Sequence, residues 1–225
     1  LNDGTHTFYV NARNGNGLTG PAGSHVCQID ATAPGAPTNV DDGVNGWSTD
    51  DTPTFTWTSP GDTSGIEGYW WAIDDNTPET GGVWTTGMTA TTGTLSDGTH
   101  TFYVKAQNGS GLVSPAGSHV CQIDATAPGA PTNVDDGVNG WSTDDTPTFT
   151  WTSPGDTSGI EGYWWAIDDN TPETGGVWTT GMTATTGTLS DGTHTFYVKA
   201  QNGSGLVSPA GSHVCQIDAT APGAP

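Results

Sequence analysis

Basic residues are almost missing from this chain, which has 3 Lys and Arg against 24 Asp and Glu among 225 residues and a formal net charge of −21. This charge repels phosphate backbones and anionic lipid, so we expect no nucleic-acid partner and no direct membrane contact. No run of about 18 apolar residues occurs, so no membrane-spanning helix is expected. No secretory signal opens the chain, which begins with Leu1; we therefore expect an excerpt or a processed product of a longer protein.

Large aliphatic side chains are also scarce, since Leu, Ile, Val and Phe together make up 32 residues. Few aliphatic residues and a high net charge are typical of disordered chains. Against disorder stand 10 Trp and 40 Thr, residue types that favour strands. No segment shows a helical period of apolar residues. The composition therefore predicts an all-β protein with an aromatic core.

The chain is an internal repeat of 94 residues, because residues 38–131 and 132–225 are identical. Residues 1–37 match the later copies with six substitutions, among them Asn11 for Lys105 and Arg13 for Gln107. We expect four parts: the last strands of an incomplete repeat (1–30), two complete domains (31–124 and 125–218), and a linker to a further repeat (219–225). Both ends fall inside the repeating pattern, so we expect the parent protein to continue in both directions.

Apolar and polar residues alternate with period two in several short segments, the pattern of half-buried strands. The clearest example is 100–106, which places His100, Phe102, Val104 and Ala106 on one face. The other candidate strands are 54–58, 69–73, 83–86, 89–95 and 118–123. Turn dipeptides such as Asp97-Gly98 and Asn108-Gly109 separate them. Seven short strands in one repeat predict a seven-stranded β-sandwich.

Four phrases of the repeat resemble a known family: residues 51–57 (DTPTFTW), 64–69 (SGIEGY), 95–102 (LSDGTHTF) and 124–131 (DATAPGAP). Their order and spacing are similar to those of the bacterial and archaeal immunoglobulin-like or fibronectin type III-like tandem repeats of giant surface proteins. The resemblance implies extracellular stalks, adhesins, fibres or surface layers, and no catalytic activity. Two departures stand out. His100 replaces a tyrosine that is common in the family, and Asn108 and Leu112 replace an Asp and an Asn, which puts a metal site at that end of the domain in doubt.

Carboxylates are the first candidates for chemistry. With seven strands that alternate between two ends, many Asp residues should gather where one domain meets the next. Crowded like charges repel, and Ca²⁺, which prefers six to eight oxygen ligands, would relieve the repulsion. The alternative is a solvated acidic surface that keeps the chain soluble. The candidate calcium ligands are Asp41, Asp42, Asp50, Asp51, Asp74, Asp75, Asp97, Asp124 and Asp156.

Each repeat has one cysteine: Cys27, Cys121 and Cys215. One cysteine per domain cannot form a disulfide within the domain. Strand parity favours a small buried apolar residue, and a disulfide between neighbouring chains of a fibre is the alternative. His119 and Cys121 share a strand face, but two ligands are too few for a structural zinc site.

Outward-facing tryptophans are candidates for contact with other chains of a fibre or with glycans. Strand parity places Trp70 on the outer sheet face, and Trp84 lies on a short strand; Trp164 and Trp178 are their equivalents in the next repeat. Lateral contact is favoured over glycan binding, because the repeat presents the same patch every 94 residues. Asn108 and Asn202 begin tripeptides that fit the N-glycosylation pattern.

No Ser/His/Asp set with a nucleophile elbow and no glycine-rich phosphate loop is present, so no enzyme is expected. The function expected is that of a structural module of an extracellular filament, stalk or adhesin. Adjacent repeats and other copies of the chain are the expected partners. The alternative from another class is a carbohydrate-binding array that uses the exposed tryptophans.

Overall fold

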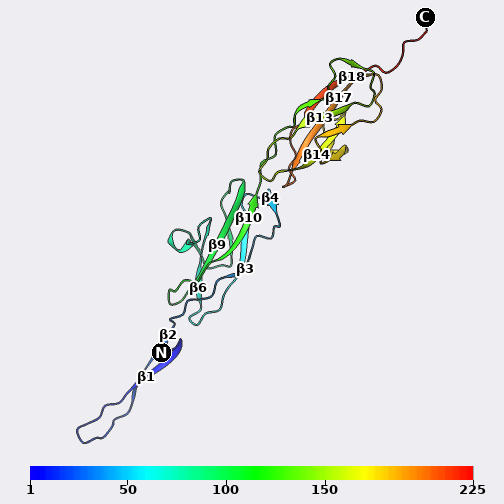
Figure 1. Ribbon diagram of the computed structural model, residues 1–225. Coiled ribbons are helices and arrows are strands. Elements are labelled where there is room, and N and C mark those ends of the chain that lie inside the picture. Colours follow the sequence, from blue (N-terminus) through cyan, green and yellow to red (C-terminus); the bar gives the residue numbers. More distant parts are fainter. Residues whose placement is uncertain (225) are drawn as a thin grey trace. The chain divides into compact units, whose positions relative to one another are not determined.

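The computed structural model describes residues 1–224, so Pro225 of the expected last linker lies outside the described residues. Residues 1–224 form one hairpin, two three-stranded sheets and two five-stranded sheets. Figure 1 labels strands from each of them. It divides into two compact units. The first comprises Leu1–Val44, Thr52–Gly93 and His100–Cys121, and the second comprises Asn45–Asp51, Thr94–Thr99 and Gln122 to the end of the described chain. The boundaries 31–124 and 125–218 stay a prediction.

The hairpin consists of antiparallel strands β1 (Gly4–Val10) and β2 (Gly23–Ile29). Its strands correspond in sequence to the last two strands of a complete repeat. Phe8 and Val10 are 64% and 57% exposed, whereas their equivalents Phe102 and Val104 are fully buried. The hairpin therefore has an inward face without the opposing sheet that covers it in a complete repeat.

The first complete repeat contains two sheets with the strand orders β3-β5-β8 and β4-β10-β9-β6-β7. Its strands are β3 (Thr38–Asp41), β4 (Trp47–Ser48), β5 (Thr54–Thr58), β6 (Ile66–Ile73), β7 (Val83–Thr85), β8 (Thr89–Thr91), β9 (Gly98–Asn108) and β10 (Gly117–Ile123). A short 3₁₀ turn, η1 (Pro78–Thr80), connects β6 to β7.

The second repeat forms the same two sheets, β11-β13-β16 and β12-β18-β17-β14-β15. Its strands are β11 (Thr132–Asp135), β12 (Trp141–Ser142), β13 (Thr148–Thr152), β14 (Ile160–Ile167), β15 (Val177–Thr179), β16 (Thr183–Thr185), β17 (Gly192–Asn202) and β18 (Gly211–Ile217), with the turn η2 (Pro172–Thr174) after β14. This pairing is an immunoglobulin-like sandwich of the fibronectin type III-like form, and the predicted fold class is confirmed.

Each described repeat has eight strands, one more than expected. The additional strand, β4 or β12, has two residues and pairs in parallel with the last strand of the repeat. Two residues are too few for alternation to mark them in a sequence.

The core is aromatic, as the composition predicts. Phe55 and Phe102, from opposite sheets, stack with ring centroids 4.2 Å apart and planes at 11°. Trp57 meets Tyr69 edge to face at 5.4 Å. Trp71 stacks on Phe102 at 5.7 Å, so it faces inward as parity predicts. Such contacts supply the packing that the scarce aliphatic residues cannot.

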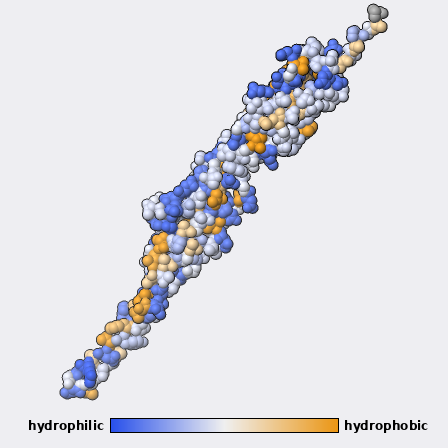
Figure 2. All heavy atoms as spheres, in the orientation of Figure 1, coloured by the Kyte–Doolittle hydropathy of each residue, from blue (hydrophilic) through white to orange (hydrophobic). Residues whose placement is uncertain are grey.

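The surface is mostly polar. On the face in Figure 2, hydrophobic spheres form small separate groups among hydrophilic and intermediate ones. Within residues 1–224, no helix has both the length and the apolar character that crossing a bilayer requires.

Candidate functional site

The main polar feature of the second unit is the linker residue Asp124, which follows β10 directly and is 1% exposed. Its backbone N–H donates to the carbonyl oxygen of Ser48 over 2.8 Å. Its Oδ2 accepts hydrogen bonds from the Ser158 backbone N–H and from Nδ2 of Asn202, both at 3.0 Å. A single residue thus bonds to Ser48 through its backbone and to the β-sandwich of β11–β18 through its carboxylate.

Asn202 completes this arrangement from the end of β17, where it is fully buried. Its Nδ2 also donates to the carbonyl oxygen of Thr126 at 3.3 Å, so one amide nitrogen holds two linker residues. Its Oδ1 accepts from the Leu206 backbone N–H at 2.8 Å and from Oγ of Ser204 at 3.0 Å. We call Asp124, Ser158 and Asn202 the linker clamp.

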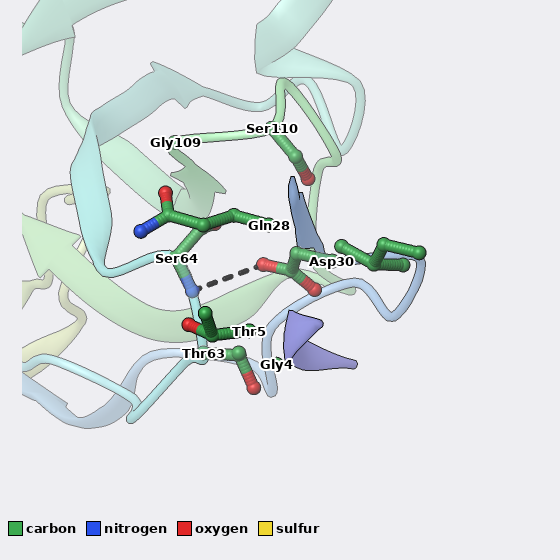
Figure 3. A pocket seen from close by; sticks show the side chains of 9 residues that line it. Gly4, Thr5, Gln28, Asp30, Thr63, Ser64, Gly109 and Ser110 are labelled. Atoms are coloured by element: carbon green, nitrogen blue, oxygen red, sulfur yellow. Dashed lines mark hydrogen bonds between the residues drawn. The ribbon is translucent and has the colours of Figure 1, made fainter. Parts of the chain in front are cut away.

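The first unit contains the same clamp, formed by Asp30, Ser64 and Asn108. Oδ2 of Asp30 accepts from the Ser64 backbone N–H at 3.1 Å and from Nδ2 of Asn108 at 3.0 Å. A cavity of about 420 Å³ adjoins it, lined by Asp30, Ser64, Gly109 and other residues; Figure 3 shows the Asp30 carboxylate directed at Ser64. Asp30 is half-buried, and Asp218, the equivalent aspartate after β18, is exposed.

A second carboxylate lies beside the clamp of the second unit. Asp156 Oδ1 accepts from the Ser158 backbone N–H at 3.3 Å and from its hydroxyl at 3.2 Å. Burial and the neighbouring Asp124 carboxylate raise the pKa of Asp156. Burial also opposes ionisation of Asp124, but hydrogen bonds from Ser158 and Asp156 outweigh it and hold the pKa of Asp124 below its ordinary value. Oδ1 of Asp124 is buried with no hydrogen-bond partner among the described residues. The pair therefore favours a shared proton or a bound cation.

The nine predicted calcium ligands are spread over both units. Asp41, Asp42, Asp74 and Asp75 belong to the first unit, and Asp50, Asp51, Asp97, Asp124 and Asp156 belong to the second. Several are engaged locally: Asp97 accepts from the Ala125 N–H at 2.8 Å, Asp75 from Thr77 at 2.7 and 2.8 Å, and Asp74 lies 2.8 Å from Nδ1 of His100. The structure brings Asp124 together with Asp156, and Asp41 with Asp42. Calcium stays a prediction, now centred on Asp124 and Asp156.

The tryptophan pair lies on the outer face of β6 and β7, a placement that strand parity predicts for Trp70. Trp70 pairs with Trp84 across the two strands, with ring centroids 4.9 Å apart and planes at 58°. Nε1 of Trp70 donates to Oε1 of Gln107 at 2.9 Å. With Glu67, these residues line an open groove of about 430 Å³. Glu161, Trp164, Trp178 and Gln201 line the equivalent groove of the second repeat.

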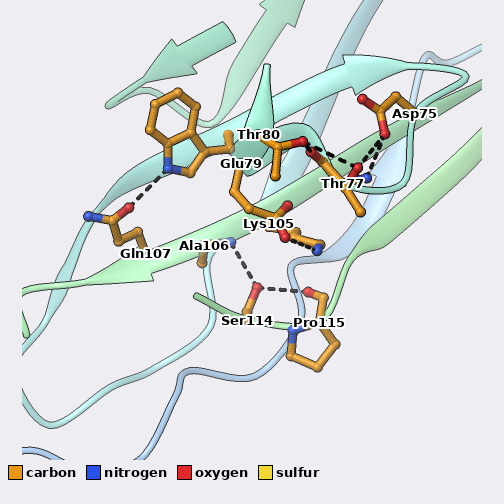
Figure 4. A network of polar contacts seen from close by, with 10 residues as sticks. Asp75, Thr77, Glu79, Thr80, Lys105, Ala106, Gln107, Ser114 and Pro115 are labelled. Atoms are coloured by element: carbon orange, nitrogen blue, oxygen red, sulfur yellow. Dashed lines mark hydrogen bonds and ion pairs between the residues drawn. The ribbon is translucent and has the colours of Figure 1, made fainter. Parts of the chain in front are cut away.

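Lys105 faces outward on β9 next to this groove and is held by Glu79 of η1, whose Oε1 accepts from Nζ at 2.7 Å (Figure 4). The Lys105 side chain is 14% exposed and that of Glu79 is 28% exposed. The turn η1 therefore covers part of the outer sheet face, and Lys105 is engaged in an ion pair.

Cys121 and Cys215 are buried and Cys27 is half-buried, and all three are free thiols. Burial raises the pKa of both Cys121 and Cys215, which lowers the thiolate fraction needed for exchange. This placement agrees with the small buried apolar residue, and the interchain disulfide stays untested. Nδ2 of Asn108 and of Asn202 is occupied in the clamps, so glycosylation at either residue would break two hydrogen bonds and open a buried site.

A Ser/His/Asp arrangement occurs at the start of β17, although the sequence motifs gave no sign of one. Nδ1 of His194 lies 2.7 Å from Asp168, and its Nε2 lies 3.5 Å from Oγ of Ser190. Nε2 also lies 2.9 Å from the carbonyl oxygen of Ser190, a group that can only accept a hydrogen bond. Nε2 therefore carries a proton and is not a free base for the Ser190 hydroxyl. The His194 side chain therefore has a structural role: it holds the start of β17 to Asp168, which follows β14.

The sequence analysis did not predict two groups of residues, the linker clamp and the contact of His119 with two aspartates. Extending the β9 alternation by one step from Ala106 places Asn108 inward, a signal that was available for the clamp. The contact of His119 with Asp41 and Asp42 joins β10 to the end of β3. No local pattern could reveal that contact, because it depends on the packing of distant strands.

Fold and clamp together define a tandem array of fibronectin type III-like β-sandwich modules, each fastened to the linker before it. No protein-family model matches the chain. Over 204 residues it is 34% identical to chitinase A1 of Niallia circulans, a match that spans 86% of this chain and 27% of that enzyme.

Two solved structures are similar at lower identity. The chicken CNTN1 FN1–FN3 domains share 17% identity at a TM-score of 0.40, over 93% of this chain and 77% of that one. The Clostridium thermocellum CbhA fibronectin(III)-like modules share 15% at 0.38, over 80% of this chain and 93% of that one. Both scores are low, so the fold assignment rests on the strand pairing described above.

Proposed function

We propose that this chain is a spacer segment of an extracellular protein, in which each module sets length and limits bending. The observation that carries the proposal is the linker clamp. Without it, a Pro- and Ala-containing linker of this length would be only semi-rigid. With it, the linker is bonded to the sandwich that follows through a carboxylate that is 1% exposed. A spacer needs a fixed linker more than it needs a ligand site.

Backbone ¹⁵N relaxation of residues 124–131 tests this function. Order parameters of about 0.85, the value of rigid backbone, are expected in the unmodified chain. In Asp124→Ala they should fall toward about 0.6, the flexible range, while those of β13 and β17 stay unchanged. Asp218→Ala is the matched control, since Asp218 is exposed. A linker that is already flexible in the unmodified chain would refute the spacer function.

The same module suits a filament, stalk or adhesin of the cell surface. The Trp70–Trp84 groove recurs at Trp164–Trp178, which gives other copies of the chain a repeated contact point. Sedimentation velocity at increasing protein concentration tests lateral association. Concentration-dependent species that disappear in Trp70→Ala/Trp164→Ala support it, and a monomer at all concentrations contradicts it.

Carbohydrate binding is the second candidate, and two observations favour it. The groove combines paired indole rings with the polar side chains of Glu67 and Gln107, a suitable surface for stacking on sugar rings. The 34% identity to a chitinase suggests β-linked amino-sugar polymers. Co-sedimentation with insoluble chitin and with cellulose tests it. Binding that is lost in the double tryptophan variant supports it, and retention equal to that of bovine albumin contradicts it.

A further inference from the structure

Each complete repeat gathers one histidine and two aspartates at a place that the spacer function does not use. Nε2 of His119 lies 3.2 Å from Oδ1 of Asp42 and 3.9 Å from Oδ1 of Asp41. One ligand atom from each of the three residues lies within 4.8 Å of the other two. In the second repeat, His213 lies 3.3 Å from Asp136 and 3.9 Å from Asp135. Each group lies within a single compact unit.

These separations are close to those of ligands on one small divalent ion. Zinc–nitrogen and zinc–oxygen bonds of about 2.0–2.2 Å place adjacent ligand atoms about 3.0–3.5 Å apart. The His119–Asp42 pair already has this separation, the His119–Asp41 pair exceeds it by a few tenths of an ångström, and the atoms of the third pair, Asp41–Asp42, lie within 4.8 Å of each other.

The carboxylates are oriented before any ion binds. Oδ1 of Asp41 accepts from the Gly43 N–H and Oδ1 of Asp42 accepts from the Val44 N–H, both at 3.0 Å. A carboxylate oxygen retains a second lone pair for a metal, and such backbone bonds fix the direction of a ligand. The imidazole is packed as well, since the His119 ring lies 6.1 Å from that of Phe55.

Burial makes a cation favourable here. The Asp42 side chain is only 3% exposed and that of His119 is 24% exposed. In the second repeat, Nε2 of His213 is buried and makes no hydrogen bond within the described residues. The Asp41 side chain is 60% exposed, so the buried carboxylate of the group is that of Asp42, and a buried charge is costly without a partner. A divalent ion would satisfy the nitrogen and both carboxylates together.

We propose that His119, Asp41 and Asp42, and equally His213, Asp135 and Asp136, bind a divalent transition-metal ion of the zinc class, with water in the remaining positions. One imidazole nitrogen and two carboxylate oxygens suit this class, whereas Ca²⁺ requires six to eight oxygens. The ion would connect the end of β3 to β10, and β11 to β18. It would thereby stabilise the sandwich where its first strand meets its last.

Isothermal titration of ZnCl₂ into chelator-treated chain tests the site. Two Zn²⁺ per chain are expected, one in His119→Gln, and none in His119→Gln/His213→Gln. His100→Gln/His194→Gln is the matched control, since both histidines also face aspartates, and it should still bind two. Unchanged stoichiometry in the His119/His213 variant overturns the proposal, as does loss of binding in Cys121→Ala/Cys215→Ala.

A second measurement needs no variant and so holds if a substitution impairs folding. In ¹H–¹³C spectra of the unmodified chain, substoichiometric Zn²⁺ should shift the imidazole signals of His119 and His213 first. A hundredfold excess of Ca²⁺ should leave these shifts in place. Earlier shifts at His100 or His194, or displacement by Ca²⁺, overturn the proposal.

Discussion

At the scale of single residues, Asn202 shows how the burial of a side chain depends on the structure around it. The asparagine recurs at positions 14, 108 and 202, but the structure buries it only where a sandwich surrounds it. Its inward direction follows from the alternation of β17, whereas its partners Asp124 and Thr126 come from a segment 76–78 residues away in the chain. Local pattern fixes the direction of a side chain, and only the assembled fold fixes its hydrogen-bond partners.

Asn202→Ala should destabilise the second sandwich by about 1–3 kcal/mol, because it leaves buried hydrogen-bonding groups without partners. Thermal unfolding followed by tryptophan fluorescence measures the change. Asn14→Ala is the matched control, since Asn14 lies exposed in the hairpin, and it should have little effect. Equal effects of the two substitutions would argue against the clamp.

His194 carries the second prediction at this scale. The Asp168 carboxylate and the Ser190 carbonyl oxygen raise the pKa of His194 above its ordinary value of 6.5. A raised histidine pKa adds stability that is complete below the unfolded pKa and is lost as pH rises through the folded pKa. NMR titration of the imidazole should give a midpoint above 6.5, and Asp168→Asn should lower it. An equal midpoint in chain and variant would contradict this coupling.

At the scale of elements, alternation predicted the strands well, because each sandwich strand has one buried face. In β5, for example, Phe55 and Trp57 are buried between three exposed threonines. Alternation could not predict β4 or the position of η1 over the outer face of β9, since both depend on contacts between distant segments. It also gave no indication of the close fit between β6 and β7.

The equivalent fit between β14 and β15 of the second repeat depends on Gly162, where an added Cβ would lie 2.3 Å from Cζ2 of Trp178. Gly162→Ala should therefore displace the indole and destabilise the sandwich by about 1–3 kcal/mol. Gly155→Ala is the control, because a Cβ there meets nothing within 4 Å. Chemical unfolding and the emission maximum of tryptophan measure both changes. A stability of Gly162→Ala equal to that of the control would mean that Trp178 is not packed on the glycine.

At the scale of the whole molecule, the calcium hypothesis now predicts binding at one carboxylate pair, Asp124 and Asp156. If Ca²⁺ binds at Asp124 and Asp156, a concentration of 100 times Kd should add about 2.7 kcal/mol of stability, and EDTA should remove it. Calorimetric Tm with Ca²⁺ and with EDTA measures this, with Mg²⁺ as a control ion. Asp156→Asn should abolish the response. A Tm that is equal in Ca²⁺ and EDTA would rule out structural calcium.

The hairpin of β1 and β2 carries the same inward side chains as β9–β10 and β17–β18, including a phenylalanine and a valine that are buried in the complete repeats. Because the two complete repeats are identical in sequence, β9–β10 and β17–β18 compete for the same partner strands during refolding from denaturant. Sandwiches made from mismatched copies would hold a nearly native core, so quality control by stability alone would hardly distinguish them. Synthesis from one end, with each sandwich closing before the next emerges, removes that competition in time.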